Sequence, residues 1–298
     1  MRLLLTGATG FVGQNLIPMI FKNCPDIDIM TLNVDLDKAN RKYPGNLYPS
    51  CINILSTDLE KVRDFDPEIV FHLATMTTPK NDTELIKPML AANIEFGVSL
   101  LDILQHCPSM KLFVNLGSFA EYRLGPQKIN DAYLYTATKT AFRCFCQYYS
   151  DLGCFKYITL VPYTVYGGKM TVKRIIDYLV ESMNSELPIK MTEGEQILDF
   201  IHVYDVANFF VFILQNKCKF YALENGEEFH LGTGRGTSIR ELASILEKKY
   251  GKKCNVIWGG IPYRKRDTMY AVAPIAKNIK ELGWKAKIKL ENGIDMLI

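Results

Sequence analysis

Short apolar runs alternate with longer helical patterns through the first half of the chain. Runs of this kind, bounded by turn residues and separated by helices, are typical of parallel strands that are buried on both faces. The sequence therefore predicts an α/β fold built on a doubly wound parallel sheet. The predicted strands are residues 3–6, 27–32, 52–55, 69–73, 112–116 and 158–161, and the predicted helices run to residue 22 and over residues 85–105 and 133–151.

The pattern changes after Gly167 and Gly168. A polar helix over residues 171–185 and irregular strands come first, and an apolar helix follows over residues 203–215. An amphipathic helix then begins after Thr237. We expect a smaller α+β substrate-binding domain that is partly interleaved with a dinucleotide-binding domain. The expected bounds are 1–167 with 197–235 for the dinucleotide-binding domain, and 168–196 with 236–298 for the substrate-binding domain.

The composition excludes several classes of protein. With 48% hydrophobic and 22% charged residues, the chain is not of the disordered class. A net charge of +3 is too small for a dedicated nucleic-acid binder and fits a small anionic ligand better. The eight cysteines form no Cys-x-x-Cys pair, so neither a disulfide framework nor a metal site is expected. No signal peptide or membrane-spanning run is recognised, and a soluble, cytoplasmic protein is expected.

A glycine-rich segment lies between the first predicted strand and the first helix. Gly7 allows a tight turn, Gly10 lets backbone N–H groups approach a pyrophosphate, and Gly13 lets helix and strand pack closely. The phosphates would lie at the positive end of the helix dipole. A purely structural turn is the alternative, but the strand–turn–helix context favours dinucleotide binding. The predicted contacts are Gly7, Thr9, Gly10, Phe11, Val12 and Gly13.

The choice between NAD and NADP is ambiguous. An acidic residue at the end of the second strand would bind the adenosine ribose and select NAD, but Asn33 occupies that place. Asn33 cannot repel a 2′-phosphate, and Arg41 could reach one, so NADPH is weakly favoured. A solvated loop is an equally good interpretation of Arg41. Asp58, after the third strand, could bind the adenine or start the next helix.

Three further residues form a candidate catalytic set. Tyr135 and Lys139 are four residues apart and therefore share one face of a helix. A nearby ammonium favours tyrosinate, so Tyr135 could serve as an acid or base near neutral pH. Ser118, at a strand end, could hydrogen-bond the substrate oxygen whose charge changes. The Tyr-x-x-x-Lys pattern is weak alone, and its value comes from its order after the glycine segment and the serine.

With these features the chain resembles the extended short-chain dehydrogenase/reductases, the family of nucleotide-sugar epimerases, dehydratases and reductases. The resemblance spans nearly the whole length and implies a Rossmann-type sheet. Within the family, the chain looks closest to the CDP-abequose synthase group, which reduces a 4-keto sugar. The resemblance also rests on residues 71–74, Asn93, 162–167, 192–200, 201–207, 232–234, 264–267 and 282–284.

The family implies roles for further residues. Lys139 would also hold the nicotinamide ribose, and Pro162 with Tyr163 would line the nicotinamide. Arg264 would bind a substrate phosphate, with an ordinary surface arginine as the alternative. His72 and His202 are expected to be structural. The remaining residues expected at the cofactor are Leu59, Leu73, Ala74, Thr75 and Asn93, and those expected at the substrate are Thr77, Ser118, Phe119 and Thr164.

The chain departs from the family pattern in places that bear on its reaction. The family's 4,6-dehydratases carry an Asp-Glu pair directly after the serine, where this chain has Phe119 and Ala120. Glu121 lies one residue too late, so dehydration is disfavoured. Two positions that usually contact the substrate diphosphate hold Val161 and Thr164 in this chain. Leu198 replaces the residue that usually precedes the family's aspartate.

The first hypothesis is therefore an NAD(P)-dependent 4-ketoreductase acting on a 4-keto-6-deoxy sugar nucleotide. The alternatives are a nucleotide-sugar 4-epimerase that retains its NAD and a non-catalytic nucleotide-sensing protein on the same fold. A homodimer is expected through the helices over residues 85–105 and 133–151. The stripe of Phe142, Phe145, Tyr148 and Tyr149 on the second helix could instead be core.

Overall fold

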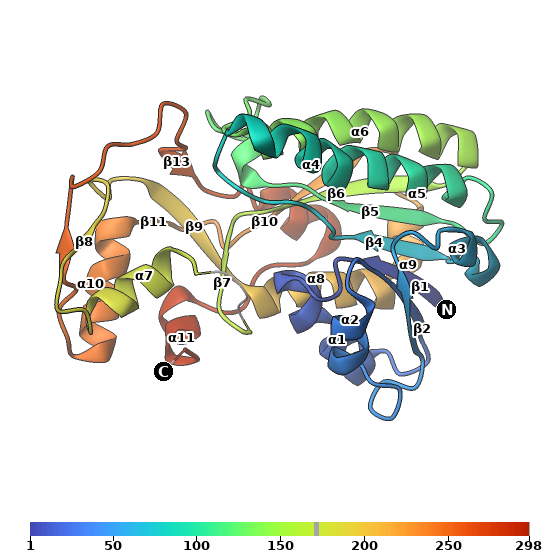
Figure 1. Cartoon of the computed structure of the whole chain (residues 1–298), viewed down its shortest axis with the longest axis horizontal. Coiled ribbons are helices and arrows are strands. Elements are labelled where there is room, and N and C mark those ends of the chain that lie inside the picture. Colours follow the sequence, from blue (N-terminus) through green and yellow to red (C-terminus); the bar gives the residue numbers. More distant parts are fainter. Residues whose placement is uncertain (170–172, 298) are drawn as a thin grey trace. The chain divides into compact units, whose positions relative to one another are not determined.

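The computed structural model describes residues 1–169 and 173–297, and the chain forms two compact units (Figure 1). The start of the polar helix predicted over residues 171–185 therefore lies partly outside the described residues. The first unit comprises Met1–Ser118, Tyr133–Val161 and Ala207–Phe229. The second comprises Phe119–Ala132, Pro162–Val206 and His230–Ile298.

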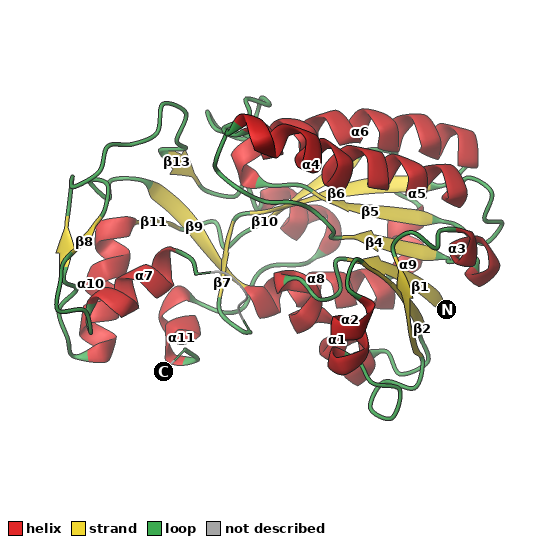
Figure 2. Ribbon diagram, in the orientation of Figure 1, coloured by secondary structure: helices red, strands yellow, loops and turns green. Residues whose placement is uncertain are grey.

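The first unit is built around a seven-stranded sheet with the order β10-β6-β5-β4-β1-β2-β3 (Figure 2). Every pairing from β3 to β6 is parallel, and the order reverses beside β1. The predicted doubly wound, Rossmann-type sheet is therefore confirmed. The strands are β1 (Arg2–Thr6), β2 (Asp28–Asn33), β3 (Cys51–Leu55), β4 (Ile69–His72), β5 (Leu112–Leu116), β6 (Lys156–Pro162) and β10 (Glu227–Leu231).

Helices cover both faces of this sheet, as buried apolar strands require. Leu4 on β1 packs in one core cluster with α3, α5 and α6, while Leu3 and Leu5 point to the opposite face. On that opposite face the rings of Phe71 and Phe210 meet at 4.8 Å between centroids. The helices are α1 (Phe11–Asn23), α2 (Leu36–Lys42), α3 (Glu60–Phe65), α4 (Ile86–Leu90), α5 (Phe96–Leu104), α6 (Leu134–Gly153), α8 (Val203–Gln215) and α9 (Lys217–Tyr221).

The long helix predicted over residues 85–105 contains an irregular turn. A 3₁₀ turn over Thr83–Leu85 leads into α4, and a π-helical turn over Ala91–Glu95 separates α4 from α5. A π-turn holds one extra residue, and such turns often lie at functional sites. Asn93, at its centre, is buried. The prediction of a regular helix was wrong at this turn, because local periodicity does not report a one-residue insertion.

The second unit contains smaller sheets and three helices. β9 (Ile197–His202) pairs with β7 (Thr164–Tyr166), β11 (Gly236–Ser238) and β13 (Tyr270–Ala271). One apolar cluster lies between β9 and the helices and includes Phe200 and Leu242. The remaining elements are a 3₁₀ turn (Phe119–Glu121), α7 (Ile175–Ser182), β8 (Ile189–Lys190), α10 (Ile239–Tyr250), β12 (Val256–Ile257), a π-turn (Asn278–Leu282) and α11 (Leu290–Asp295).

The described residues offer neither a membrane-spanning helix nor a candidate metal site. Among residues 1–169 and 173–297, no helix combines the length and the apolar character that a membrane crossing requires. Across the same residues, no group of three or more His, Cys, Asp or Glu side chains could hold a metal ion. The eight cysteines are all free thiols.

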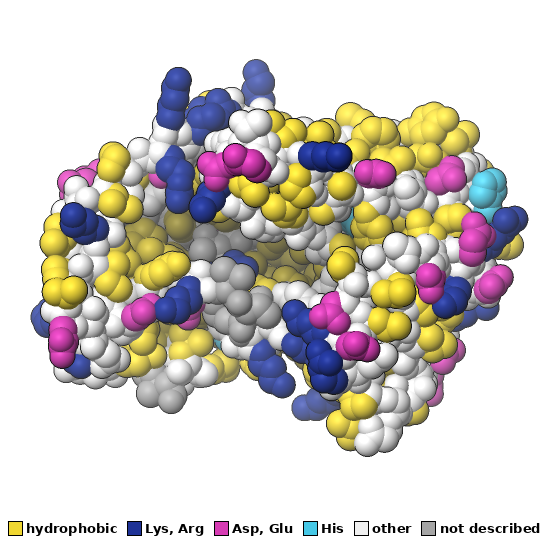
Figure 3. All heavy atoms as spheres, in the orientation of Figure 1, with side chains coloured by type: hydrophobic (Ala, Val, Ile, Leu, Met, Phe, Trp, Pro, Cys, Tyr) yellow, Lys and Arg dark blue, Asp and Glu magenta, His cyan; other side chains and the backbone are white. Residues whose placement is uncertain are grey.

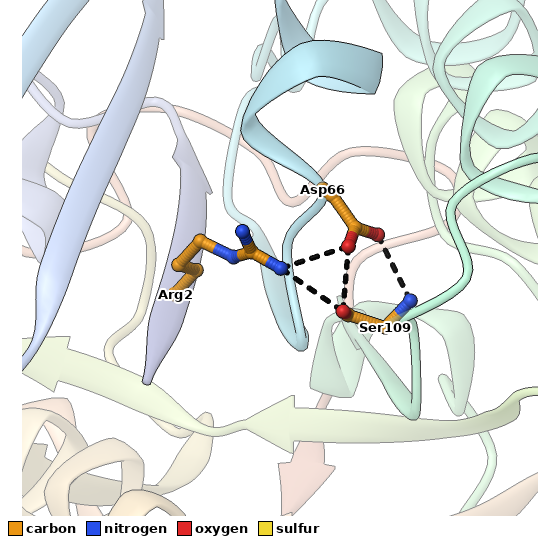
Figure 4. Close-up of polar contacts among 3 residues, drawn as sticks. All are labelled: Arg2, Asp66 and Ser109. Carbon is orange, nitrogen blue, oxygen red and sulfur yellow. Dashed lines mark hydrogen bonds and ion pairs between the residues drawn. The ribbon is translucent and has the colours of Figure 1, made fainter.

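A polar cluster joins three segments at the amino-terminal edge of the seven-stranded sheet (Figure 4). Asp66, directly after α3, has a left-handed backbone with φ of 48°. Its carboxylate accepts hydrogen bonds from the backbone N–H of Ser109 at 2.9 Å and from the Ser109 hydroxyl at 2.6 Å. Arg2, at the start of β1, pairs with the same carboxylate at 2.8 Å.

The surroundings of Asp66 determine its pKa. Burial by itself would raise the pKa of this carboxyl, but the Ser109 hydrogen bonds and the charge of Arg2 outweigh burial and lower the pKa. A carboxylate whose pKa is lower in the folded chain than in the unfolded chain stabilises the fold at pH values above the unfolded-state pKa. That stabilisation is lost as the pH falls through the folded pKa.

We expect Asp66→Ala to lower the free energy of unfolding at neutral pH by about 1–2 kcal/mol, because the hydrogen bonds and the ion pair are lost. Asp66→Asn should cost less, because Asn tolerates a left-handed backbone and keeps an acceptor oxygen. Denaturant unfolding at neutral pH and near pH 3 measures both effects. The advantage of the wild type should shrink in acid, and an advantage independent of pH would contradict this account.

Candidate functional site

The residues predicted to bind a dinucleotide in the first unit follow the carboxyl ends of its parallel strands. Gly7 follows β1, Asp58 comes shortly after β3, and Leu73 follows β4. Asn33 is the last residue of β2, and Ser118 comes two residues after β5. Because the carboxyl ends of parallel strands share one edge of a sheet, these residues lie along one edge, where ligands of such folds bind.

The turn after β1 adopts a backbone that requires glycine. Gly7 has φ of +71°, and a Cβ there would lie 2.7 Å from the backbone N of Ala74. The N–H of Gly10 donates to the carbonyl of Gly7 at 3.0 Å and closes the turn. A Cβ on Gly10 would meet only the Gly7 oxygen, at 3.1 Å, so the outer side of this turn is open among the described residues.

The start of α1 offers backbone N–H groups to an anion. In the described chain no side chain caps this helix, and its first turn holds no acidic residue. Uncapped N–H groups and the helix dipole together favour a bound anion. The hydroxyl of Tyr43 donates to the carbonyl of Ala8 at 2.7 Å and braces the loop. Open space at Gly10 beside a helix start without an acidic residue fits a phosphate group.

The ends of β2 and β3 carry polar side chains that are already engaged. The Asn33 amide donates to the hydroxyl of Thr31 at 2.7 Å and is buried. Asp35 caps α2 by accepting from the N–H of Lys38 at 2.8 Å. Asp58 pairs with Lys61 at 2.7 Å, which places it at the start of α3 beside Leu59. The last residue of β2 is thus Asn33 and not an acidic residue, and the nearby Asp35 is already engaged.

Ser118 and Tyr135 meet in the first unit. Their side-chain oxygens are 3.0 Å apart, which is hydrogen-bond distance. Tyr135 lies in the first turn of α6, whose start is held by the N–H of Leu134 donating to Asn81 at 3.1 Å. The rings of Tyr133 and Tyr135 stack at 6.0 Å. Both hydroxyls are half-buried, a setting suited to proton transfer with a bound substrate.

Lys139 lies one turn further along α6 and is buried. Its charge acts on His72, which ends β4. Burial first, and then the Lys139 charge, lower the pKa of His72 to about 3. His72 is therefore neutral at ordinary pH, and its Nδ1 bonds with the hydroxyl of Thr6 at 3.1 Å. These contacts support the structural role predicted for His72.

Asn93 connects the loop after β4 to the helix that carries Tyr135 and Lys139. Its side-chain oxygen accepts from the N–H of Met76 at 2.7 Å and from the hydroxyl of Thr75 at 3.1 Å. Its amide donates to the carbonyl of Met76 at 3.1 Å and to the hydroxyl of Thr138 at 2.9 Å. These four bonds use the full capacity of the amide, so Asn93 positions its neighbours.

The second unit gathers an aromatic group around Tyr163. Phe119 stacks on Tyr163 with 5.8 Å between ring centroids. The Tyr163 hydroxyl bonds with Nδ1 of His230 at 3.2 Å, and Tyr122 packs on the same imidazole. Pro162 and Tyr163 are buried, and Thr164 begins β7. Sequence reasoning missed His230, because nothing in its local sequence indicates this contact.

The two arginines of the segment before β13 differ in how firmly they are held. Arg266 donates to the carbonyl of Asp131 at 3.0 Å and to the side chain of Asn130 at 3.2 Å. Arg264 has a side chain that is 61% exposed, and a long contact of 3.6 Å to Asp267 holds it. Arg264 can therefore turn toward a ligand, whereas Arg266 anchors the loop. The anchoring role of Arg266 was not predicted.

Among the other positions singled out in the sequence, Thr77 is exposed, whereas Asp199 and His202 stabilise the second unit. Thr77 is exposed on the loop after β4. The Asp199 carboxylate accepts from the N–H groups of Thr233, Gly234 and Ala273, and burial raises its pKa. Asp199 therefore organises the turn after β10. Burial also lowers the pKa of His202, which lies against Gly167.

Comparison with known proteins identifies relatives over the full chain. The model of the NAD dependent epimerase/dehydratase family matches residues 3–232. CDP-abequose synthase from Salmonella typhimurium is 28% identical over 300 residues, covering 99% of this chain and 96% of that protein. A putative UDP-glucose 4-epimerase from Methanocaldococcus jannaschii is 26% identical over 311 residues, covering 99% and 97%.

Solved structures show the same fold. UDP-glucuronic acid 4-epimerase from Bacillus cereus, in complex with UDP-glucuronic acid and NAD, has a TM-score of 0.86 to this chain. The two chains are 22% identical, and the match covers 99% of this chain and 97% of the other.

We expect Gly13→Ala to destabilise the first unit, because a Cβ there would lie 2.4 Å from the carbonyl oxygen of Gly7 and 2.7 Å from that of Ala8. Backbone cannot yield as a side chain does, so the cost should be about 1–3 kcal/mol. Gly45→Ala is the matched control, because nothing lies within 4 Å of its Cβ position. Thermal unfolding compares them, and equal midpoints for both variants would refute the packing role.

Proposed function

Because the chain belongs to the NAD dependent epimerase/dehydratase family, we propose that it reduces a 4-keto-6-deoxy sugar nucleotide with a nicotinamide dinucleotide. The observation that carries the proposal is the 3.0 Å contact between the hydroxyls of Ser118 and Tyr135 in the unit that also holds the glycine turn. The family match confirms the predicted class of NAD(P)-dependent enzyme, while the reaction within the family is the subject of the proposal.

The first unit has the features that a dinucleotide needs. We assign the pyrophosphate to the open turn at Gly10 and the positive end of α1, with Thr9, Phe11 and Val12 alongside. Along the strand ends, Asn33, Asp58, Leu59, Leu73, Ala74 and Thr75 would follow the rest of the cofactor. Lys139 would hold the nicotinamide ribose, and in the second unit Pro162 and Tyr163 would line the nicotinamide.

In the proposed reaction, the bound cofactor supplies the hydride that reduces the substrate carbonyl carbon. Tyr135 donates its phenolic proton to the carbonyl oxygen, which becomes the hydroxyl of the product. Ser118 hydrogen-bonds the same oxygen as negative charge develops on it. Lys139, buried one turn away, stabilises the tyrosinate that remains until a proton from solvent replaces the one transferred.

Cationic side chains of the second unit support an anionic substrate. Lys and Arg side chains gather over the loop that precedes β13 (Figure 3). That loop carries Arg264, Lys265 and Arg266, and Arg264 is the one with an exposed, loosely held guanidinium. A planar guanidinium binds phosphate oxygens in pairs, so Arg264 is proposed to bind the substrate diphosphate. Thr77, Phe119 and Thr164 would contact the sugar.

NADPH is the proposed cofactor, with NAD as the alternative. The last residue of β2 is Asn33 instead of the acidic residue that selects NAD, and the nearby Asp35 is used in capping α2. Arg41 is exposed nearby at the end of α2 and could pair with a 2′-phosphate. The family name and the solved neighbours concern NAD, which keeps the alternative open.

The 4-epimerase alternative rests on the named relatives. The Methanocaldococcus jannaschii protein and the Bacillus cereus structure are both described as 4-epimerases. Against this, the Salmonella typhimurium synthase has the higher identity of the two curated relatives, 28% against 26%. The same three catalytic residues serve either reaction, so cofactor behaviour distinguishes them: a reductase consumes a loosely bound cofactor, whereas an epimerase retains it.

We further propose a homodimer that forms through α4, α5 and α6. Phe145, Tyr148 and Leu152 lie on one face of α6 with 37%, 58% and 53% of their surface exposed. Hydrophobic side chains cover much of the surface over this helix (Figure 3). Phe142, by contrast, is buried in the core. The mass of the protein in solution tests the proposal, and a monomer at high concentration would refute it.

The reaction is tested by mixing the protein with NADPH and a CDP-4-keto-6-deoxyhexose and following absorbance of the reduced cofactor. We expect consumption of NADPH, faster than with NADH. Tyr135→Phe should slow the rate by about 10²–10⁴-fold, because it removes the proton donor and leaves the ring. Tyr148→Phe, on an exposed part of the same helix, should keep the wild-type rate.

Three other outcomes would contradict the reductase. No consumption with any 4-keto sugar nucleotide would remove it. Co-purified NAD without net turnover, together with interconversion of a sugar nucleotide, would establish the epimerase. An unchanged biological function of Tyr135→Phe would indicate a non-catalytic, nucleotide-sensing protein. The mass of the nucleotide that co-purifies gives independent evidence on the cofactor.

A further inference from the structure

A cavity in the second unit is separate in its residues from the proposed catalytic site. Its volume is about 520 Å³, within the range of small-molecule sites. None of its lining residues is among those assigned to the cofactor or the substrate, and all belong to the second unit. They are Phe200, Thr233, Arg235, Thr237, Lys285, Ala286, Lys287, Ile288, Lys289 and Leu290.

Three lysines alternate along one wall of this cavity. Lys285, Lys287 and Lys289 are exposed, whereas Trp284 and Leu290 at the ends of the segment are buried. Within residues 1–169 and 173–297, no hydrogen bond or ion pair engages the ammonium groups of these lysines. Three cations are thus available to a ligand.

The backbone that carries the lysines is held in place. The carboxylate of Asp205, on α8, accepts from the N–H of Lys287 at 3.1 Å and from the N–H of Ile288 at 2.8 Å. The carbonyl of Lys289 accepts from the N–H of Gly293 at 2.9 Å. A rigid backbone reduces the entropy that is lost when a ligand binds, so these contacts prepare the wall for binding.

The opposing charges at this cavity are fewer and already paired. Arg235, which also lines the cavity, pairs with Glu291 at 2.8 Å and with Glu241 at 3.5 Å. The four cations therefore face two carboxylates, both engaged by Arg235. Elsewhere in the unit, Lys249 is neutralised by Asp295 at 2.6 Å. The cavity therefore carries an excess of positive charge.

The inner surface of the cavity is apolar. Phe200 and Leu290 are buried side chains that line it, and Ala286 and Ile288 are half-buried between the lysines. A ligand that suits both features carries several negative charges and a flat or apolar body. Lysine ammonium groups bind phosphates as point charges. We propose that this cavity is a second site, for a nucleoside polyphosphate.

The proposal is tested by isothermal titration of the whole protein, saturated with NADPH, with CTP. We expect a second binding event that Arg264→Ala leaves intact, because Arg264 is not in this cavity. The triple substitution Lys285→Ala, Lys287→Ala and Lys289→Ala should weaken that event at least about tenfold. The control replaces three exposed lysines elsewhere, Lys219, Lys248 and Lys252, with Ala and should leave it unchanged.

Each other outcome is decisive. CTP binding that the triple substitution does not weaken, in a protein with the wild-type unfolding midpoint, would overturn the proposal. Inorganic triphosphate binding as tightly as CTP would remove the role of the apolar surface. Binding of anionic lipid vesicles without binding of CTP would assign the lysines to a membrane surface instead. The titration does not depend on hydride transfer, so failure of the reductase assay leaves it interpretable.

Discussion

The reversal of strand order beside β1 determines where a ligand can lie in the first unit. Because β2 and β4 pair with β1 on opposite sides, the connections leave this point in opposite directions and keep the carboxyl end of β1 accessible. The turn at Gly7, the end of β4 and the serine after β5 then share one edge. The turn after β1 and the end of β4 also approach each other closely, because a side chain at Gly7 would collide with the backbone of Ala74.

The geometry of the proposed catalytic residues depends on contacts that converge on α6. Asn81 holds the first turn of this helix, and Asn93 ties Thr138, the residue before Lys139, to the loop after β4. The Thr138 hydroxyl also donates to the carbonyl of Tyr135 at 2.6 Å. Chemistry at Tyr135 thus rests on amide side chains that do not themselves react. In the second unit Arg266 has a similar role, since it anchors the loop at Asp131 while the side chain of Arg264 is exposed.

The sequence predicted the fold well, because apolar periodicity reports burial directly and a glycine turn between strand and helix has few other uses. The meeting of Ser118 and Tyr135 was also foreseeable, since one follows a strand and the other begins a helix. The contacts of Asn93 and Arg266 were not, because their partners lie up to 136 residues away and no local pattern marks them. The lysine-lined cavity could not be predicted for the same reason, because its walls come from separate segments of the chain. The roles assigned to individual site residues stay predictions.

The π-turn over Ala91–Glu95 has a consequence for how this chain can vary. Its extra residue sets the rotation of α4 relative to α5, and each residue of a helix advances the rotation by about 100°. Loss of a single residue here would restore a regular helix and swing Asn93 away from Met76 and Thr138. The number of residues in this segment is therefore constrained as tightly as their identity. A deletion here would be more disruptive than most substitutions.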